Sequence, residues 1–176
     1  VNILTGILLE QLVQVTDKYN VLWSDRLMIT TAASLHDIGK IGIDDKILNK
    51  AGKLTPEEFE VIKSHTVVGA DMMERIPQFR QLDAYDFAVD IARHHHERWD
   101  GRGYPDGLVG DEISIWSQVV ALADVYDALR SKRVYKDAYG REKVMQMITG
   151  GECGAFNPEL LKAFEAVEPA IDRLYR

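Results

Sequence analysis

The chain has 176 residues, of which 46% are hydrophobic and 28% are charged, and its formal net charge is −7 at pH 7. This length and composition are typical of one globular domain with a full hydrophobic core. The acidic balance argues against a nucleic-acid polymer as partner, because such a surface would need a basic patch. A membrane span would need about 20 consecutive apolar residues, and the sequence contains no such stretch.

Cysteine content and the start of the chain indicate its context. Cys153 is the single cysteine, which excludes an internal disulfide framework and fits a reducing, cytoplasmic location. No repeat, low-complexity tract or linker-like stretch interrupts the sequence, so residues 1–176 are expected to form one domain. Because the chain starts at Val1 rather than at a methionine, we expect a fragment of a longer multidomain protein, truncated at its N-terminal helix.

Hydrophobic residues recur at helical spacing along nearly the whole chain. Apolar positions between residues 3 and 15 predict a first helix. Ser24 is the expected N-cap of a second helix that runs to residues 36–37. The Thr55–Glu58 segment combines a capping threonine, a proline in the first turn and a glutamate three residues after the cap. It predicts a third helix that carries His65 in its middle.

The second half of the chain continues the helical pattern. A helix is expected from about residue 83 to residue 96, followed by a loop at 99–107, where three glycines and a proline interrupt the spacing. Helical spacing resumes over residues 115–129, and Asn157 caps a last helix that reaches the C-terminus. Alternating β-branched patterns are nearly absent. The expected fold is therefore all-α, a compact bundle of helices with a metal site in its core.

The five histidines are candidate metal ligands: His36, His65, His94, His95 and His96. A single histidine on a helix is more often a packed or capping residue, and a run of three could equally favour a helix C-terminus through its charge. The set together points to metal binding. Neutral imidazole and carboxylate are the usual nitrogen and oxygen ligands of Zn, Mn and Fe, and a binuclear site needs about six such groups.

Carboxylates complete the candidate set. Adjacent residues on a helix point about 100° apart, so His36 and Asp37 could serve two neighbouring metals, or one metal from two sides. Asp124 interrupts the apolar run Ala121–Val125. A buried carboxylate must be neutral, paired or metal-bound, and burial beside two cations would satisfy Asp124.

Three segments carry a family resemblance. Residues 36–40 read HDIGK and resemble the signature of the HD superfamily. Residues 95–105 read HHERWDGRGYP and look like the segment that names the HD-GYP subfamily. Residues 122–129 read LADVYDAL and precede RVYK at 133–136, where the subfamily usually has RPYK. Because the segments keep their order and spacing, the chain is identified as a member of the HD-GYP family.

The resemblance implies a metal-dependent cyclic di-GMP phosphodiesterase with a defined ligand set. Its two divalent ions would be held by His36, Asp37, His65, His95, His96 and Asp124. Asp37 would bridge the ions, and a hydroxide that also bridges them would attack phosphorus. Iron or manganese is the expected metal, with zinc, nickel or magnesium as alternatives.

The resemblance also implies substrate contacts. Lys40 matches a lysine that contacts a phosphate oxygen, so Asp37 and Lys40 are the expected catalytic residues; a solvated loop lysine is the alternative for Lys40. Arg133 and Lys136 match basic residues that face the phosphates or the guanine base, although surface positions explain them nearly as well. The loop residues Gly103, Tyr104 and Pro105 would border the substrate cleft and dock GGDEF-domain proteins, or would only shape a tight connection.

Two positions depart from the ligand pattern. His94 is expected outside the metal ligands, and Glu97 could orient a ligating imidazole through its second nitrogen. Many family members have a third metal held by an upstream Glu and His. Here no histidine precedes His36, and the upstream carboxylates are Glu10, Asp17 and Asp25, so no third metal is predicted.

The leading function is hydrolysis of cyclic di-GMP to pGpG, to GMP or to both. A second hypothesis keeps the metals and changes the substrate to another cyclic dinucleotide or a nucleotide. A third is a catalytically silent module that senses a cyclic dinucleotide or docks a partner. An upstream receiver or sensor domain and a homodimer are further expectations from the resemblance.

Overall fold

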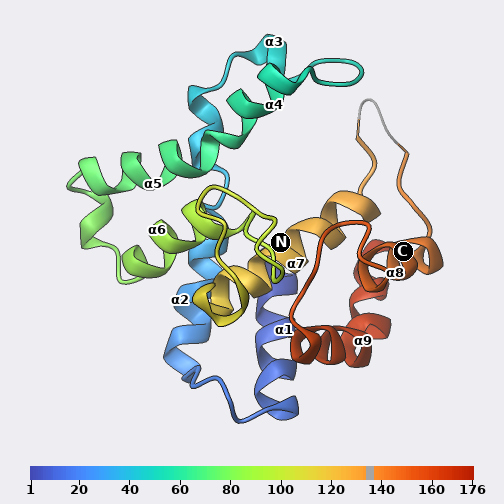
Figure 1. The fold of residues 1–176 in the computed structure, drawn as a ribbon. Helices are drawn as coiled ribbons and strands as arrows, with labels where there is room; N and C mark the ends of the chain where they lie inside the picture. Colours follow the sequence, from blue (N-terminus) through green and yellow to red (C-terminus); the bar gives the residue numbers. More distant parts are fainter. Residues whose placement is uncertain (134–136) are drawn as a thin grey trace.

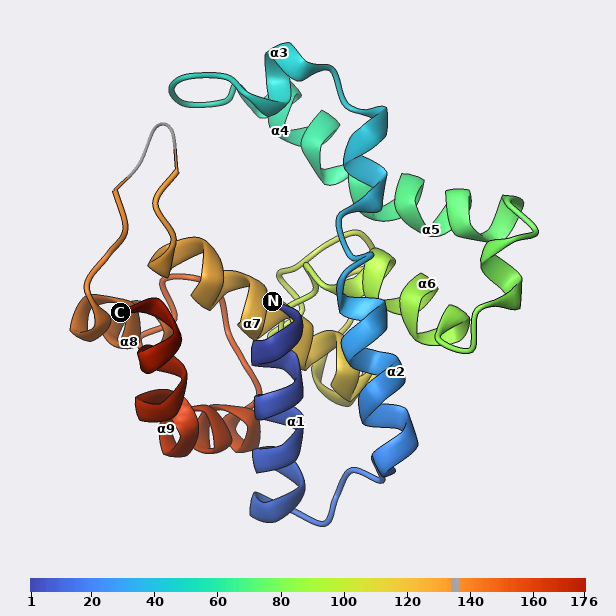
Figure 2. The same cartoon turned by 180° about the vertical axis from the view of Figure 1, so that it is seen from behind.

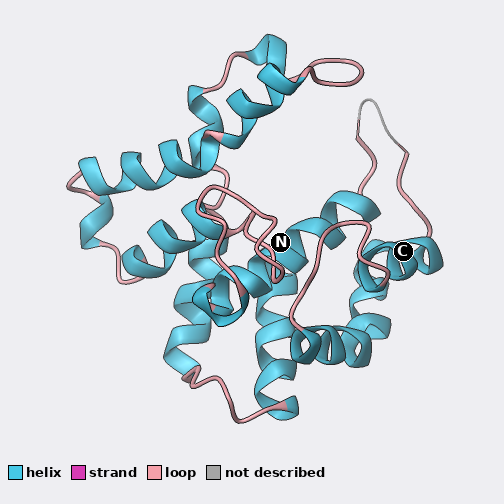
Figure 3. Ribbon diagram, in the orientation of Figure 1, coloured by secondary structure: helices cyan, strands magenta, loops and turns pink. Residues whose placement is uncertain are grey.

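The computed structural model describes residues 1–133 and 137–176. Within these ranges the regular elements are all helices, as Figure 3 shows, which confirms the expected all-α fold. The α-helices are α1 (Asn2–Val15), α2 (Trp23–Ala33), α3 (Asp45–Leu48), α4 (Pro56–Lys63), α5 (His65–Arg75), α6 (Tyr85–His94), α7 (Ile115–Arg130), α8 (Arg141–Thr149) and α9 (Pro158–Asp172). The 3-10 helices are η1 (Ile38–Gly42), η2 (Phe79–Gln81), η3 (Gly110–Glu112) and η4 (Arg173–Tyr175).

Helix α7 forms the centre of the core. Its residues Val119 to Ala123 are at most 2% exposed, and α1, α6 and α8 all pack against this helix. A helix that is apolar on every side has to be covered on every side. Asp124 directly follows the buried stretch, so the core fixes its position. None of the helices in the described ranges is long and apolar enough to cross a membrane.

The other helices lie around α7. Helix α1 packs between α2 and α9, while α6 lies against α2, α5 and α7 (Figures 1 and 2). Both views place α3 and α4 at the edge of the molecule, away from α9. The segment after α6 returns across the ends of α6 and α7 before α7 begins (Figure 1). Helix α6 contacts both α2 and α5, and the ends of α2 and α6 and the start of α5 come together.

Two of the helix starts expected from the sequence are confirmed. The Thr55 hydroxyl accepts the N–H of Glu58, and the Glu58 carboxylate accepts the N–H of Thr55. At α9 the Asn157 side chain accepts the N–H of Glu159. Each side chain satisfies backbone donors that the first turn leaves without a partner. The loop at 99–107 and the helix that follows it are also present.

The second helix differs from its expectation at both ends. Ser24 was expected to cap it, but α2 begins at Trp23 after the N-cap residue Leu22. The Asp25 carboxylate accepts the N–H of Leu22 at 3.0 Å, so this acid supplies the capping contact one residue after Ser24. The helix ends at Ala33, and His36 and Asp37 lie in the turn that leads into η1.

The third expected helix is two helices. The helix that begins after Thr55 ends at Lys63, and α5 begins at His65. Side chains at the break bond to backbone carbonyls: Ser64 donates to Val61 O, and Thr66 donates to Lys63 O. Such local bonds compete with the helix ladder. His65 therefore stands at the start of a helix rather than in its middle.

Two described helices were not predicted at all. Helix α3 has four residues, which is too short for a hydrophobic period to be recognised. Helix α8 has only two buried side chains, Val144 and Ile148. The helix expected to end near residue 96 ends at His94, so His95 and His96 lie beyond it.

Gly39 allows η1 to lie directly against α5. A Cβ atom at this position would be 1.9 Å from His65 O and 2.6 Å from Gly69 N. Both neighbours are backbone atoms and cannot rotate away. Gly39 lies two residues after Asp37, so this close contact sets how near Asp37 comes to His65.

We predict that Gly39→Ala separates η1 from α5 and lowers the free energy of unfolding by about 1–3 kcal/mol, the usual cost of overpacking. Denaturant unfolding of the variant and the wild type measures this loss. Gly140→Ala is the matched control, because nothing lies within 4 Å of a Cβ at that position. Equal stability of the Gly39 variant and the wild type would contradict the predicted close contact.

Candidate metal centre

Asp37 directs its two carboxylate oxygens at different imidazoles. Its Oδ1 lies 3.3 Å from Nε2 of His65 and 3.4 Å from Nε2 of His95. Its Oδ2 lies 3.2 Å from Nε2 of His36, which is also 3.3 Å from Oδ1 of Asp124. Two groups of donor atoms share this centre: Asp37, His65, His95 and His96 form one, and His36, His95 and Asp124 form the other.

Backbone carbonyls orient three of these imidazoles. The Nδ1 atoms of His36, His65 and His95 lie 2.6–2.8 Å from the carbonyl oxygens of Ala33, Ile62 and Ile91. With Nδ1–H donating to a carbonyl, the lone pair of Nε2 is free to point at the centre. A hydrogen bond of this kind fixes the tautomer and the direction of a metal-ligating imidazole.

Burial keeps two of the imidazoles uncharged. It lowers the pKa of His95, and it lowers the pKa of His96 to about 2. A neutral imidazole is the form that binds a metal. Burial would also raise the pKa of Asp37, but contacts with His36, His65 and His95 outweigh it and hold that pKa well below its usual range. Asp37 is therefore a carboxylate that faces several nitrogen donors.

His36 is the exception in this set. Burial alone would lower its pKa, but contacts with Asp124 and Asp37 raise it to about 10. Without a metal, a proton on His36 would supply positive charge between the two carboxylates. A metal cation could take over that role, because it satisfies the same two carboxylates.

The residues fit a divalent metal ion. Nε2 of His36 and Oδ1 of Asp37 are buried atoms without hydrogen-bond partners among the described residues. Buried polar atoms are rarely left in this state unless a water, an ion or a functional role accounts for them. The donors are imidazole nitrogens and carboxylate oxygens, which suit Zn, Mn and Fe.

The Gly103–Pro105 loop packs against the donor groups. The Tyr104 ring stacks on His96, with centroids 4.9 Å apart and an interplanar angle of 14°. Nζ of Lys63 lies 5.4 Å from the centroid of the same ring. Only glycine fits at 103, because a Cβ there would lie 2.4 Å from Arg98 N. The loop therefore borders the centre as expected, although its contact with a substrate remains a prediction.

Glu97 has a different role from the one expected. Its two carboxylate oxygens accept the backbone N–H groups of Asp106, at 2.7 Å, and Leu108, at 3.0 Å. The expectation that it orients a ligating imidazole is wrong, because its hydrogen-bond partners are these two N–H groups, and Nδ1 of His36, His65 and His95 faces a backbone carbonyl instead. Glu97 therefore holds the loop.

His94 lies between two carboxylates outside the two donor groups around Asp37. Its Nδ1 is 2.7 Å from Asp90, and its Nε2 is 2.8 Å from Asp106. Arg93 donates two further hydrogen bonds to Asp106. Asp90 also accepts hydrogen bonds from Ser114, Trp116 and Ser117. This network, which we call the His94 clamp, ties the loop to α6 and to the start of α7.

The remaining expected residues divide into three cases. Nζ of Lys40 lies 3.0 Å from Oδ2 of Asp37, so the structure brings this lysine to the centre. Arg133 is exposed and belongs to neither donor group. Lys136 lies outside the described residues. The sequence missed Asp90 and its partners at the start of α7; the spacing of four between Asp90 and His94 was the available signal.

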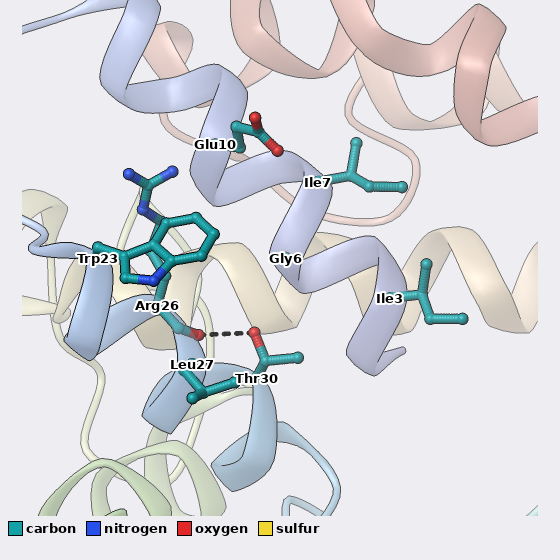
Figure 4. A pocket seen from close by; sticks show the side chains of 8 residues that line it. All are labelled: Ile3, Gly6, Ile7, Glu10, Trp23, Arg26, Leu27 and Thr30. Atoms are coloured by element: carbon teal, nitrogen blue, oxygen red, sulfur yellow. Dashed lines mark hydrogen bonds between the residues drawn. The ribbon is translucent and has the colours of Figure 1, made fainter.

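Two pockets differ in their relation to the centre. One of about 410 Å³ includes His96, Arg98 and Tyr104 in its wall and so adjoins the donor groups. Another of about 260 Å³ lies between α1 and α2, where Arg26 stacks over Trp23 (Figure 4). No member of the donor groups lines that second pocket. The first pocket therefore adjoins the centre through His96.

Comparison with known proteins agrees with this arrangement. The HD domain family model matches residues 7–160. The chain is 46% identical over 144 residues to a protein of Vibrio cholerae serotype O1 named cyclic di-GMP phosphodiesterase, covering 80% of this chain and 29% of that protein. It is 40% identical to a second protein of that organism, named 3'3'-cGAMP-specific phosphodiesterase 2, over 82% of this chain and 27% of that protein.

A solved structure confirms the fold. Bd1817, described as an HDG"Y"P protein from Bdellovibrio bacteriovorus, superposes with a TM-score of 0.67 at 18% identity, over 96% of this chain and 51% of that chain. The chain belongs to the HD domain family, and the HD-GYP resemblance of its motifs is confirmed. It spans about a third of the length of the curated relatives that it matches.

We predict that His94 makes stability depend on pH. Burial lowers the pKa of His94, but Asp90 and Asp106 outweigh it and raise the pKa above 6.5. A raised pKa means that the stabilisation is full below the unfolded-state pKa and is lost as pH rises through the folded-state pKa. The difference in unfolding free energy between the wild type and His94→Gln should therefore be largest in mildly acidic buffer and shrink towards alkaline pH.

Denaturant unfolding of metal-loaded protein at several pH values measures this difference. Asp106→Asn removes one of the two carboxylates and should show a weaker pH dependence than the wild type. If the difference in unfolding free energy between the wild type and His94→Gln stays constant with pH, the predicted contribution of His94 protonation is wrong.

Proposed function

We propose that this chain is the catalytic domain of a metal-dependent phosphodiesterase that hydrolyses cyclic di-GMP to pGpG, GMP or both. The observation that carries the proposal is the Asp37 carboxylate, whose two oxygens face separate groups of donors. Membership in the HD domain family and relatives named cyclic di-GMP phosphodiesterases support the substrate. The chain spans only part of the length of those relatives, so the activity of the full-length protein is also a proposal.

Two divalent ions, iron or manganese, would be held by His36, Asp37, His65, His95, His96 and Asp124, with Asp37 between them. When bound, such a pair supplies an activated water and stabilises charge on a phosphoryl oxygen. The chain's own part is to fix the donors. Carbonyl contacts orient the imidazoles, and burial excludes water that would otherwise compete for the donor atoms.

Lys40 and the loop would position the substrate. The Lys40 ammonium lies beside Asp37, and its side chain is 36% exposed, so it can reach a phosphate oxygen while remaining near the centre. Tyr104 would limit the movement of His96 by stacking on it. The acidic chain could then bind an anionic substrate, because the ions and Lys40 supply local positive charge.

A second substrate has specific support. One relative at 40% identity is named a 3'3'-cGAMP-specific phosphodiesterase, and ions held by the donor groups would act on the phosphodiester linkage, which is the same whatever base is attached. A GGDEF-domain partner, an upstream receiver or sensor domain, a homodimer and a cytoplasmic location stay predictions from the family resemblance.

The test is to load the protein anaerobically with Fe(II) or Mn(II), incubate it with cyclic di-GMP or 3'3'-cGAMP, and separate the products by chromatography. We expect turnover of cyclic di-GMP to exceed that of 3'3'-cGAMP. Preference for 3'3'-cGAMP would favour the second substrate. Binding of cyclic di-GMP without turnover of either compound would overturn the enzyme and leave a sensing module.

We predict that Asp37→Ala removes most of the bound metal together with the activity, because its oxygens contact His65 in one donor group and His36 in the other. Elemental analysis of the purified protein gives the metal content, and the chromatographic assay gives the activity. Asp17→Asn is the matched control, because Asp17 is an exposed acid outside the donor groups. This variant should keep both the bound metal and the activity. Metal retained in full by Asp37→Ala would show that Asp37 does not hold the ions.

A further inference from the structure

Arg98 is held under the loop that precedes α9. Its Nε donates to Cys153 O at 3.1 Å, and its Nη1 donates to Glu97 O at 3.0 Å. Gly154 packs directly on the side chain, since a Cβ there would lie 2.7 Å from Cδ of Arg98. The guanidinium also lies over the Phe156 ring, 5.3 Å from its centroid. These contacts fix the position of the positive charge.

The Arg98 charge has no carboxylate partner in the described part of the chain. None of the ion pairs found there within 4.0 Å includes Arg98. Arg130 is a useful contrast, because it is largely buried and lies 2.6 Å from Asp172. Burial lowers the pKa of Arg98, but a guanidinium stays protonated in proteins. A shielded cation paired only with carbonyls favours an anionic ligand.

A pocket of about 410 Å³ opens beside this charge. We call it the Arg98 pocket; its wall includes His96, Arg98, Asp100, Arg102 and Tyr104. Asp100 lies 3.9 Å from the exposed Arg102 and forms no ion pair with Arg98. His96 is also a member of the donor group around Asp37. A ligand in this pocket would therefore adjoin a phosphodiester bound at the metal centre.

We propose that the Arg98 pocket binds the second phosphate of a cyclic dinucleotide whose first phosphodiester lies at the metal centre. The inference rests on the proposed function. A cyclic dinucleotide carries two phosphodiester groups in one ring. Nε and Nη1 of Arg98 already donate to carbonyls, and Nη2 can donate a charge-assisted hydrogen bond to a phosphate oxygen. A stacked base fits less well, because Tyr104 already stacks on His96 and has Lys63 over its ring. Arg98 is then a residue that selects substrates with two phosphates.

The test compares Arg98→Met with the wild type on two substrates. Cyclic di-GMP has two phosphodiester groups, whereas bis(p-nitrophenyl) phosphate has one. Loss of a hydrogen bond to a charged group should raise the KM for cyclic di-GMP by roughly 10- to 100-fold. The Kd of a non-hydrolysable phosphorothioate analogue, measured by calorimetry, should rise by a similar factor. Hydrolysis of bis(p-nitrophenyl) phosphate should change by less than about twofold, because that substrate does not enter the pocket.

The matched control is Arg102→Met. Its side chain is 89% exposed at the same pocket, so solvent screens its charge and the KM for cyclic di-GMP should change little. Arg98→Lys keeps the charge but loses the planar guanidinium that the carbonyls of Cys153 and Glu97 hold in place, and it replaces Arg98→Met if that variant fails to fold. Its KM for cyclic di-GMP should rise severalfold, with bis(p-nitrophenyl) phosphate hydrolysis unchanged.

An unchanged KM for cyclic di-GMP in folded, metal-loaded Arg98 variants would overturn the inference while leaving the proposed function intact. Equal losses on both substrates would also overturn it, since they would indicate damage to the metal centre. A wild type that hydrolyses bis(p-nitrophenyl) phosphate but no cyclic dinucleotide would instead remove the proposed substrate, and this inference with it.

Discussion

The arrangement of the centre depends on the contacts that the Asp37 carboxylate makes. One oxygen faces His65 and His95, and the other faces His36, which in turn contacts Asp124. Oδ1 of Asp37 and Nε2 of His36 are buried without hydrogen-bond partners among the described residues, which a cation in this space would satisfy. The same geometry makes the centre suited to metal ions.

The fold brings these donors together by ending helices near them. His36 and Asp37 follow the end of α2, His65 begins α5, and His95 follows the end of α6. At each of the three histidines the imidazole Nδ1 lies within hydrogen-bond distance of a carbonyl oxygen in the preceding turn. A carbonyl oxygen has two lone pairs, so Ile91 O can accept from the imidazole as well as from the backbone N–H of His95. The helix ends therefore supply the contacts that orient the ligands, while α7 places Asp124 from the core.

The structure brings together the side chains that the family resemblance groups as metal ligands, and their binding of metal stays a prediction. Motif order and spacing placed His36, Asp37 and Asp124 in one centre because such patterns reflect required chemistry. The Thr55 cap was also readable, since it is a local contact. The break at Ser64 was not, because it depends on competition between side-chain and ladder hydrogen bonds within an apparently continuous helical period. Glu97 was misassigned because its partners, the N–H groups of Asp106 and Leu108, lie about ten residues away.

Anomalous X-ray diffraction from crystals of the Mn(II)- or Fe(II)-loaded protein, recorded on both sides of the metal absorption edge, tests the central claim most directly. The account predicts two anomalous peaks about 3.5–4 Å apart, with the Asp37 carboxylate between them and Asp124 beside one. A single peak, or two peaks that do not share Asp37, would contradict it.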